Sequence, residues 1–275
     1  MTPTVRQAVP DDATRALILD LAARVERQDG APPLSDQTVS QLTSPAVTHL
    51  LATDGDELAG YAQLDGPAAE VAARADAVGV LLDDARPDLV WSHGRSSRLI
   101  GQLEQRGFRR ARELHQLRRP LDALPTDPPL ADGVTVRAFE PGRDDSTWLA
   151  LNAAAFVHHP EQGRMTQADL DARMAEPWFD AAGFLLAERG GELVAFHWTK
   201  IHPDGLGEVY VLGVAPAAQG LGLGGALLVR GLRHLRERGC PTVLLYVDGD
   251  NPTALHLYER DGFARYDLDV QWARD

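Results

Sequence analysis

Glu208 is the residue whose setting most clearly indicates proton transfer. It lies near the start of an otherwise apolar run, Gly207–Val214, which is typical of a buried strand. A charged side chain in a core strand is costly unless it has a partner or a task, so Glu208 is a candidate general base. The alternative is a glutamate exposed at the edge of a sheet.

A glycine-rich turn follows this strand and is a candidate anion site. Glycines occur at positions 220, 222, 224 and 225, around the start of an apolar-periodic helix expected at Gly224–Arg238. The first N–H groups of a helix lack intrahelical partners and carry partial positive charge, so they can bind a pyrophosphate. The spacing does not fit a Rossmann fingerprint, and the sequence lacks the Gly-Lys-Ser/Thr ending of a P-loop. A helix start without a ligand remains the alternative.

Two motifs in this region resemble the GNAT family of acetyl-CoA-dependent N-acetyltransferases. Gln219-x-x-Gly222-x-Gly224 is similar to the family's pyrophosphate-binding turn. The segment from Asn251 to Phe263 matches the family's Asn-x-x-Ala-x-x-x-Tyr-x-x-x-Gly-Phe pattern at every position. The resemblance implies an acetyltransferase that uses acetyl-CoA as cosubstrate and no metal. The residues that would bind acetyl-CoA are Leu212, Gly213, Val214, Gln219, Gly220, Leu221, Gly222, Leu223, Gly224, Gly225, Asn251, Pro252, Thr253, Ala254, Leu255 and His256.

Acetyl transfer to an amine needs a base, a stabilised oxyanion and a proton for the departing thiolate. Glu208 suits the base, acting directly or through water. Tyr258 matches the tyrosine that GNAT enzymes commonly use as general acid, and the alternative is a packing tyrosine. In the family this strand carries a bulge that exposes an N–H to the acetyl oxygen, and Gly213 suits such a bulge.

Three segments of the second half are rich in polar groups: 158–166, 176–180 and 196–200. Together with 207–210 and 245–247 they closely resemble the mycothiol synthases, a tandem branch of the GNAT family. Segments 29–33 and 91–94 of the first half resemble them more weakly. The resemblance implies transfer of acetyl to the cysteinyl amine of cysteinyl-glucosaminyl-inositol, giving mycothiol and CoA. The side chains that would contact this substrate are Asp36, Glu161, Lys200, Glu208 and Tyr246. Asp36 stands where the family usually has a glutamate.

Two alternatives stay open for the function. One is a tandem GNAT enzyme that acetylates another amine, on an aminoglycoside or a protein. The other is an acyl-CoA sensor without catalysis. The adjacent His158 and His159 could suggest a metal, but side chains on neighbouring residues point in different directions and no third ligand follows at a useful spacing.

The fold is predicted to be α/β (α+β), with two tandem GNAT domains, each a mixed, mainly antiparallel sheet flanked by helices. Three short segments of the first half recur in the second: 5–8 in 136–139, 55–61 in 190–196, and 105–108 in 260–263. A proline-rich stretch lies between the halves. We therefore predict a degenerate domain at 1–120, a linker at 121–130 and a catalytic domain at 131–275. Since tandem fusion replaces the dimer of many GNAT proteins, we expect a monomer.

Each half is expected to begin with a strand and a helix and to continue with a hairpin. The expected helices are 14–28, 146–155, 224–238 and 252–261, and the expected strands are 48–53, 57–65, 183–188, 192–202, 207–214 and 242–248. After Ala69–Val71 the first half has no Gln-x-x-Gly-x-Gly turn, and its closing region lacks the second motif. We therefore expect one acetyl-CoA site per chain.

Composition excludes several other classes of protein. The chain has 27 Lys+Arg and 40 Asp+Glu residues, a net charge of −13 at pH 7, which disfavours nucleic-acid binding. A single cysteine, Cys240, excludes an internal disulfide framework and a cysteine-based zinc site. No apolar run is long enough to indicate a membrane helix, and the polar start does not resemble a secretory signal. We therefore expect a cytoplasmic protein.

Overall fold

The computed structural model describes residues 2–95, 97–157 and 162–274. Contacts divide the chain into two compact units. Unit one contains Met1–Gln116, Val247–Asn251 and Tyr266–Asp275, and unit two contains Leu117–Tyr246 and Pro252–Arg265. The sequence placed all of 131–275 in one domain. The units differ from that division because the end of the last strand pairs with a strand of unit one, Val270 with Ser92.

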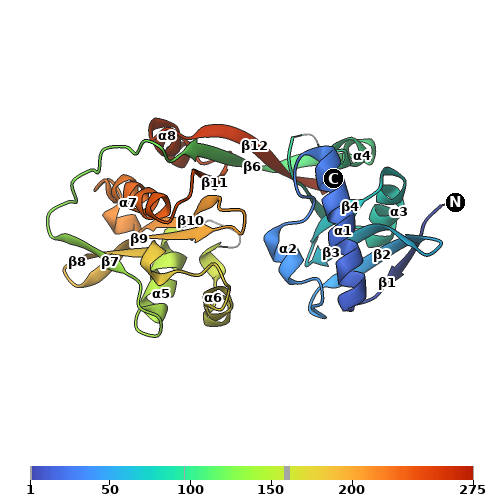
Figure 1. The fold of residues 1–275 in the computed structure, drawn as a ribbon, viewed down its shortest axis with the longest axis horizontal. Coiled ribbons are helices and arrows are strands. Elements are labelled where there is room, and N and C mark those ends of the chain that lie inside the picture. Colours follow the sequence, from blue (N-terminus) through green and yellow to red (C-terminus); the bar gives the residue numbers. More distant parts are fainter. Residues whose placement is uncertain (1, 96, 158–161, 275) are drawn as a thin grey trace. The chain divides into compact units, whose positions relative to one another are not determined.

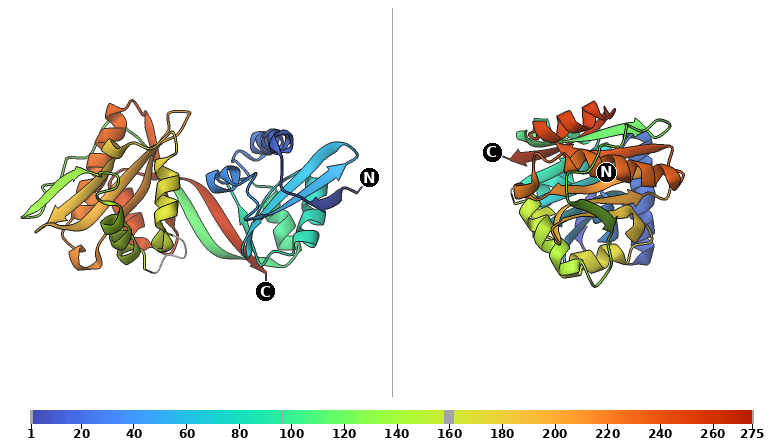
Figure 2. Two further views of the ribbon diagram at one scale, coloured as in Figure 1. Left: turned by 90° about the horizontal axis from the view of Figure 1, so that it is seen from below. Right: turned by 90° about the vertical axis from the view of Figure 1, so that its left-hand side faces the viewer.

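Unit one is a sheet with helices on both faces (Figure 2, left). Its strands lie in the order β1-β2-β3-β4-β5-β12, and β4 and β5 are parallel to each other. Helix α1 packs its apolar side on β3 and β4, while α3 and α4 cover the other face. The elements introduced here are β1 (Thr4–Gln7), α1 (Asp12–Asp29), α2 (Asp36–Ser40), β2 (Thr48–Asp54), β3 (Glu57–Asp65), β4 (Ala68–Ala73), α3 (Ala75–Ala85), β5 (Leu89–Ser92), α4 (Leu99–Gln105) and β12 (Ala264–Arg274).

Unit two repeats this plan, with its strands in the order β6-β11-β10-β9-β8-β7. Strand β6 is divided between the units, since its first part, up to Gln116, belongs to unit one. Helix α7 covers one face of the sheet, and α5 and α6 lie on the other (Figure 1). The α5 side is an aromatic core in which Trp148 and Trp198 are fully buried. Its elements are β6 (Phe108–Pro120), β7 (Val134–Ala138), α5 (Asp145–Ala155), α6 (Gln167–Met174), β8 (Phe184–Arg189), β9 (Glu192–Ile201), β10 (Gly207–Val214), α7 (Leu223–Glu237), β11 (Thr242–Asp248) and α8 (Pro252–Arg260).

The proline-rich stretch 121–130 has no helix or strand and is fixed to unit two. The Leu121 N–H donates to the Pro241 carbonyl at 2.9 Å, and the Leu121 side chain is buried. Asp127 pairs with Arg230 and Arg233 of α7 at 2.9 and 3.0 Å. Because both ends of this stretch make such contacts, it follows the surface of unit two instead of acting as a free tether.

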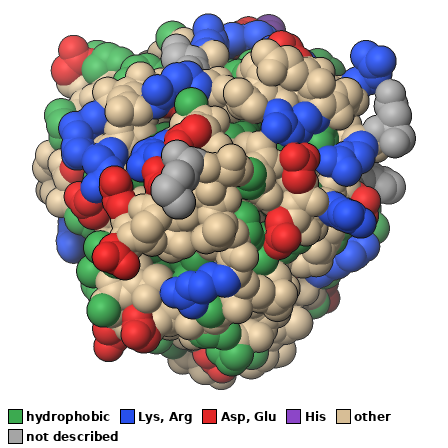
Figure 3. All heavy atoms as spheres, turned by 90° about the vertical axis from the view of Figure 1, so that its right-hand side faces the viewer, with side chains coloured by type: hydrophobic (Ala, Val, Ile, Leu, Met, Phe, Trp, Pro, Cys, Tyr) green, Lys and Arg blue, Asp and Glu red, His purple; other side chains and the backbone are tan. Residues whose placement is uncertain are grey.

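Among the described residues, no helix is long and apolar enough to cross a membrane. Within the same residues, no group of three or more His, Cys, Asp or Glu side chains is arranged to hold a metal ion. Acidic and basic side chains are interspersed on the face shown in Figure 3, so the negative charge is not gathered there.

Candidate active site

The glycine-rich turn leads into the N-terminal end of α7. Gly220 and Gly222 have φ angles of +82° and +73°, a left-handed conformation that residues with a Cβ rarely adopt. A Cβ at either position would meet no protein atom within 4 Å. Backbone conformation therefore requires these two glycines even before any ligand is considered.

The start of α7 presents unused hydrogen-bond donors. Gly222 is the N-cap and has no side chain to accept from the helix, and the first turn contains no acidic residue. The first bond within the helix runs from the Ala226 N–H to the Gly222 carbonyl at 3.1 Å. No described residue accepts a hydrogen bond from the amides of Leu223, Gly224 and Gly225. These donors and the helix dipole suit a pyrophosphate.

Strands β10 and β11 separate soon after they begin to pair. Their parallel ladder covers only Gly207 with Val243 and Glu208 with Leu244, although β10 continues to Val214. The β11-facing edge of β10 therefore leaves backbone groups unpaired beyond Glu208. This edge includes Leu212–Val214, which the sequence assigned to acetyl-CoA, and it leads directly to the turn before α7. An extended ligand arm could add to this edge as a strand does.

The predicted bulge at Gly213 is wrong. The register between β9 and β10 shifts between Val209 and Val211, so Tyr210 is the extra residue, whereas Gly213 pairs regularly with Phe196. Glycine is needed at 213 for packing, because a Cβ there would lie 2.5 Å from Cε1 of Phe196 and 3.1 Å from the Phe156 ring. The sequence could not separate these two reasons for a glycine in a strand.

Glu208 is buried, with 7% of its surface exposed. The antiparallel register pairs it with Lys200, so both side chains lie on one face of the sheet. Lys200 Nζ is 3.8 Å and His202 Nε2 is 2.7 Å from Glu208 Oε2. No described residue contacts Oε1 by a hydrogen bond or ion pair. The edge-exposed alternative is therefore wrong, and one oxygen of a buried carboxylate remains without a partner among the described residues.

Lys200 is enclosed by two aromatic rings. Its Nζ lies 5.3 Å from the centre of the Trp178 ring and 5.7 Å from that of Tyr210. The Tyr210 hydroxyl accepts a hydrogen bond from Arg173 Nε at 2.8 Å, and burial raises the pKa of Tyr210. Lys200 is also the only lysine in a chain whose other basic residues are all arginine. A lone lysine among arginines indicates a position that needs a compact ammonium, and this signal can be read from the sequence alone.

Tyr258 lies in α8, and the second motif explains its position. Gly262, with a φ of +86°, ends the helix: its N–H donates to the Glu259 carbonyl, and the Phe263 N–H donates to the Tyr258 carbonyl. This is a Schellman cap, in which the Phe263 ring packs edge-on against the Tyr258 ring at 5.7 Å. Burial raises the pKa of Tyr258 to about 12, so the phenol keeps its proton at neutral pH. Its hydroxyl has no hydrogen-bond partner among the described residues.

The remaining predicted residues that the structure describes lie on β11, on α2 and around the start of α8. Tyr246, 42% exposed, lies on β11 two residues after Leu244, so strand alternation places it on the same face as Leu244. Asp36 is exposed in the first turn of α2 in unit one. Glu161 lies outside the described residues. Of the second motif, Asn251–Thr253 and His256 are exposed around the start of α8, whereas Leu255 is buried.

The corresponding strand–helix junction of unit one looks different. Only Arg74 separates β4 from α3, whereas residues 215–222 separate β10 from α7. Arg74 pairs with Asp54, Glu57 and Asp76 at 3.1, 3.3 and 2.7 Å. Asp76 lies in the first turn of α3, where a negative charge already meets the helix dipole and would repel a phosphate.

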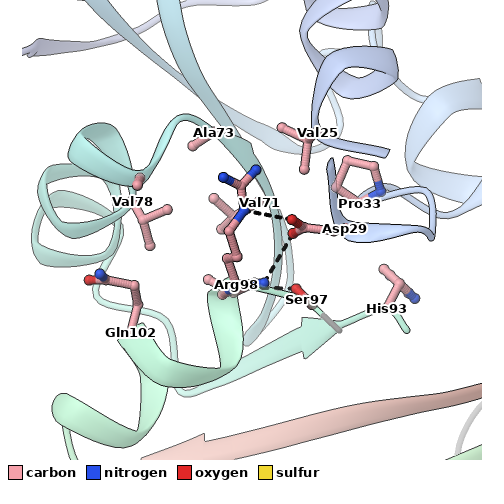
Figure 4. Close-up of a pocket in the computed structure, with 12 residues that line it drawn as sticks. Val25, Asp29, Pro33, Val71, Ala73, Val78, His93, Ser97, Arg98 and Gln102 are labelled. Carbon is pink, nitrogen blue, oxygen red and sulfur yellow. Dashed lines mark hydrogen bonds and ion pairs between the residues drawn. The ribbon is translucent and has the colours of Figure 1, made fainter. Parts of the chain in front are cut away.

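Unit one also contains a small cavity, of about 110 Å³. Figure 4 shows Asp29 and Arg98 facing each other at its wall. Asp29 accepts from the Arg98 backbone N–H at 3.0 Å and from Arg98 Nε at 2.6 Å, so both of its oxygens are engaged. Small-molecule pockets typically measure about 300–1,000 Å³, so this cavity is below their usual size.

Comparison with known proteins adds sequence relatives. Residues 150–263 match the family model described as acetyltransferase (GNAT) family. A mycothiol acetyltransferase from Streptomyces avermitilis is 50% identical over 291 residues, covering 98% of this chain and 94% of the relative.

Two solved structures share the fold over nearly the whole chain. A GCN5-related N-acetyltransferase from Sphaerobacter thermophilus has a TM-score of 0.73 at 24% identity and covers 98% of this chain and 94% of its own. A tandem GNAT protein from the clavulanic acid biosynthesis pathway has a TM-score of 0.71 at 16% identity, with 98% of both chains covered. This likeness confirms the fold class predicted from the sequence, a tandem arrangement of mixed sheets flanked by helices.

Proposed function

Because the chain belongs to the mycothiol acetyltransferases, a family of GNAT acetyltransferases, we propose that it acetylates the cysteinyl amine of cysteinyl-glucosaminyl-inositol. The products are mycothiol and CoA, and acetyl-CoA supplies the activated acetyl group. The observation that carries the proposal is the setting of Glu208. It is a buried carboxylate with an available oxygen, at the point where β10 and β11 separate and close in the chain to the unused amides at the start of α7.

The acetyl-CoA site is assigned to the unpaired edge of β10 and the turn that follows it. The backbone of Leu212–Val214 would pair with the pantetheine arm, and Gln219–Gly225 would hold the pyrophosphate through the first amides of α7. The start of α8, Asn251–His256, would complete the site. The fit rests on the unused donors at Leu223–Gly225 and on the absence of an acidic residue from the first turn of α7.

Glu208 and Tyr258 divide the proton transfers. The substrate arrives as an ammonium, and Glu208 takes one of its protons, so that the nitrogen lone pair can attack the thioester carbonyl. Backbone N–H groups on the β11-facing edge of β10 would stabilise the oxyanion. When the C–S bond breaks, Tyr258 donates its phenolic proton to the thiolate. Its high pKa keeps that proton available at neutral pH. The second ammonium proton then leaves the amide nitrogen and restores the Tyr258 phenol, and Glu208 releases its proton to solvent.

Lys200, which lies beside Glu208, and Tyr246 would hydrogen-bond sugar or inositol hydroxyls of the amine substrate. Asp36 and Glu161 are proposed to attract the ammonium of the same substrate, since a carboxylate accepts from a cation. We assign one acetyl-CoA site to each chain, because Arg74 and Asp76 fill the corresponding junction of unit one. We also propose that the protein is cytoplasmic and monomeric. Light scattering of the purified protein would test the monomeric state.

The direct test is product formation. Purified protein is incubated with acetyl-CoA and cysteinyl-glucosaminyl-inositol, and mass spectrometry should find mycothiol, with one free thiol of CoA released per acetyl transferred. An aminoglycoside and a peptide amine serve as competing acceptors. Faster acetyl transfer to the aminoglycoside or to the peptide amine would show that this amine, and not cysteinyl-glucosaminyl-inositol, is the preferred substrate. Binding of acetyl-CoA without thiol release to any acceptor would indicate a sensor instead.

A further inference from the structure

His202 lies beside the proposed base although neither motif includes it. It follows the last residue of β9 and is two positions beyond Lys200, so strand alternation directs both side chains to the face that carries Glu208. A short turn leads from His202 to β10. In this turn the His202 N–H donates to the Leu206 carbonyl, and the Gly205 N–H donates to the His202 carbonyl, each at 2.9 Å.

The contact between His202 and Glu208 has a defined direction. An ionised carboxylate only accepts hydrogen bonds, so His202 Nε2 carries a hydrogen and donates it to Oε2 across 2.7 Å. The His202 side chain is 22% exposed, and that of Glu208 is 9% exposed. A hydrogen bond to a charged acceptor in such a buried setting is stronger than one between neutral groups.

The charged and titratable side chains that contact Glu208 within the described residues meet the same carboxylate oxygen. Lys200 of β9 lies 3.8 Å from Oε2, the same oxygen that His202 contacts. Tyr210 of β10 faces Lys200, and its hydroxyl is held by Arg173 of α6. Both direct contacts therefore fall on Oε2, and neither uses Oε1.

We infer that His202 is the positioning residue of the base: it holds Glu208 Oε2, so that Oε1 is the oxygen that takes the proton from the substrate ammonium. This inference rests on the proposed acetyl transfer. In the step, one N–H bond of the ammonium breaks and an O–H bond forms at Oε1. The Nε2–H donor stays on Oε2 throughout, because a protonated carboxyl still accepts at its second oxygen.

Three variants separate positioning from simple support of the turn. His202→Ala removes the donor. His202→Gln keeps an N–H donor at nearly the same distance from the backbone. Asp204→Ala is the matched structural control, because the Asp204 carboxylate holds the same turn by accepting from the Leu206 N–H at 3.0 Å and has no contact with Glu208.

The measurement is kcat and KM for the amine acceptor, with thermal unfolding in parallel. His202→Ala should lower kcat about 10–100-fold, the range for loss of a hydrogen bond to a charged group, with the KM for acetyl-CoA unchanged. His202→Gln should restore most of the rate. Asp204→Ala should change thermal stability alone.

Equal losses of kcat in His202→Ala, His202→Gln and Asp204→Ala would overturn the inference, because they would show that these residues only maintain the structure of the turn. An unchanged kcat in His202→Ala would also overturn it. Failure of the proposed function looks different: the wild-type protein itself would not acetylate the cysteinyl amine.

Discussion

Glu70 of unit one and Glu208 of unit two occupy the same position in their sheets. Each is the last residue of its strand that still pairs with the parallel neighbour, Glu70 with Trp91 and Glu208 with Leu244. Duplication has therefore placed a carboxylate at the separation point of both strand pairs. What differs between the two units is the surroundings of these carboxylates.

Glu70 has no available oxygen. Its Oε2 accepts from the Ser35 N–H at 2.6 Å and lies 3.4 Å from His93 Nε2, and its Oε1 accepts from Ser35 Oγ at 2.8 Å. Burial alone would raise the pKa of Glu70, but the contacts with His93 and Ser35 lower it below the usual value. Glu70 is thus a structural carboxylate, whereas Glu208 keeps one oxygen for a substrate.

The same substitution at the two glutamates should therefore have different effects: on kcat at Glu208 and on thermal stability at Glu70. Glu208→Gln should lower kcat by about 10²–10⁴, as expected for loss of a general base. Glu70→Gln should leave kcat unchanged and lower the melting temperature, because an amide cannot pair with a charged His93. Steady-state rates and thermal unfolding of both variants check this. A large loss of kcat in Glu70→Gln would contradict the division of roles.

Acetyl-CoA should bind with a stoichiometry of one per chain, measured by calorimetric titration. The start of α7 offers open donors, while Arg74 and Asp76 fill the equivalent start of α3. Gly222→Ala should weaken binding up to about tenfold, because an alanine turn that relaxes in the free protein must return to the left-handed conformation to present the α7 amides, at a cost of roughly 1–2 kcal/mol. Gly222→Asn is the control and should recover part of the affinity, since asparagine tolerates this conformation better. Two bound molecules per wild-type chain would refute the single site.

Tyr258→Phe should lower kcat by about 10²–10⁴ without a structural penalty. Its hydroxyl has no partner in the described part of the chain, and the ring would still pack on Phe263. Burial raises the pKa of Tyr258 to about 12, so deprotonation of the phenol begins only as pH approaches that value. The kcat profiles of wild type and variant should therefore run parallel up to pH 10. An alkaline limb below pH 10 that vanishes in the variant would mean that the phenol titrates earlier.

Much of unit two could be predicted from local sequence patterns. The apolar run 207–214 is β10 with the same bounds, and the expected helix 224–238 is α7 within one residue at each end. Glycine spacing identified the turn between them, because left-handed positions select glycine. Helix and strand periodicity depends on neighbours within a few residues, so these elements could be predicted from the sequence.

Features that depend on pairing between distant residues could not be predicted from the sequence. The pairing of Val270 with Ser92 leaves no local pattern, so the sequence could not show that the last strand contributes to unit one. The bulge at Tyr210 was wrongly placed at Gly213, because a glycine needed for ring packing looks the same as one needed for a bulge. His202 could be recognised only once the register of β9 and β10 was known.

Lys200→Arg and Lys200→Met should impair different kinetic constants. A guanidinium can bond both oxygens of a carboxylate, so arginine would engage Glu208 Oε1 and lower kcat. Methionine fills a similar volume without charge, so it should mainly raise the KM of the amine substrate by removing a donor to its hydroxyls. Initial rates over a range of acceptor concentrations separate the two constants. The same effect from both substitutions would exclude capture of Oε1 by arginine.

His197 should make unit two less stable as the pH falls below neutrality. The imidazole is fully buried, and its Nδ1 donates to the Leu227 carbonyl at 2.9 Å, while Nε2 has no hydrogen-bond partner among the described residues. Burial, with the nearby His234, lowers the pKa of His197 to about 4. The ring also packs directly on α7, where a Cβ at Gly231 would lie 2.1 Å from it, so the ring has no room to turn toward a new partner.

The sign follows from proton binding. Above about pH 6.5 neither the folded nor the unfolded chain protonates this ring, so it imposes no pH dependence there. Between about pH 6.5 and pH 4, His197 is protonated in the unfolded chain but not in the folded chain. This difference lowers the free energy of unfolding by at most about 3 kcal/mol. His197→Asn keeps a donor for the Leu227 carbonyl and cannot titrate. Denaturant unfolding of both proteins from pH 4.5 to 7.5 should therefore show a shallower acid decline in the variant, whatever its stability at pH 7.5. Equal slopes would mean that the buried ring is protonated as readily in the folded chain as in the unfolded one.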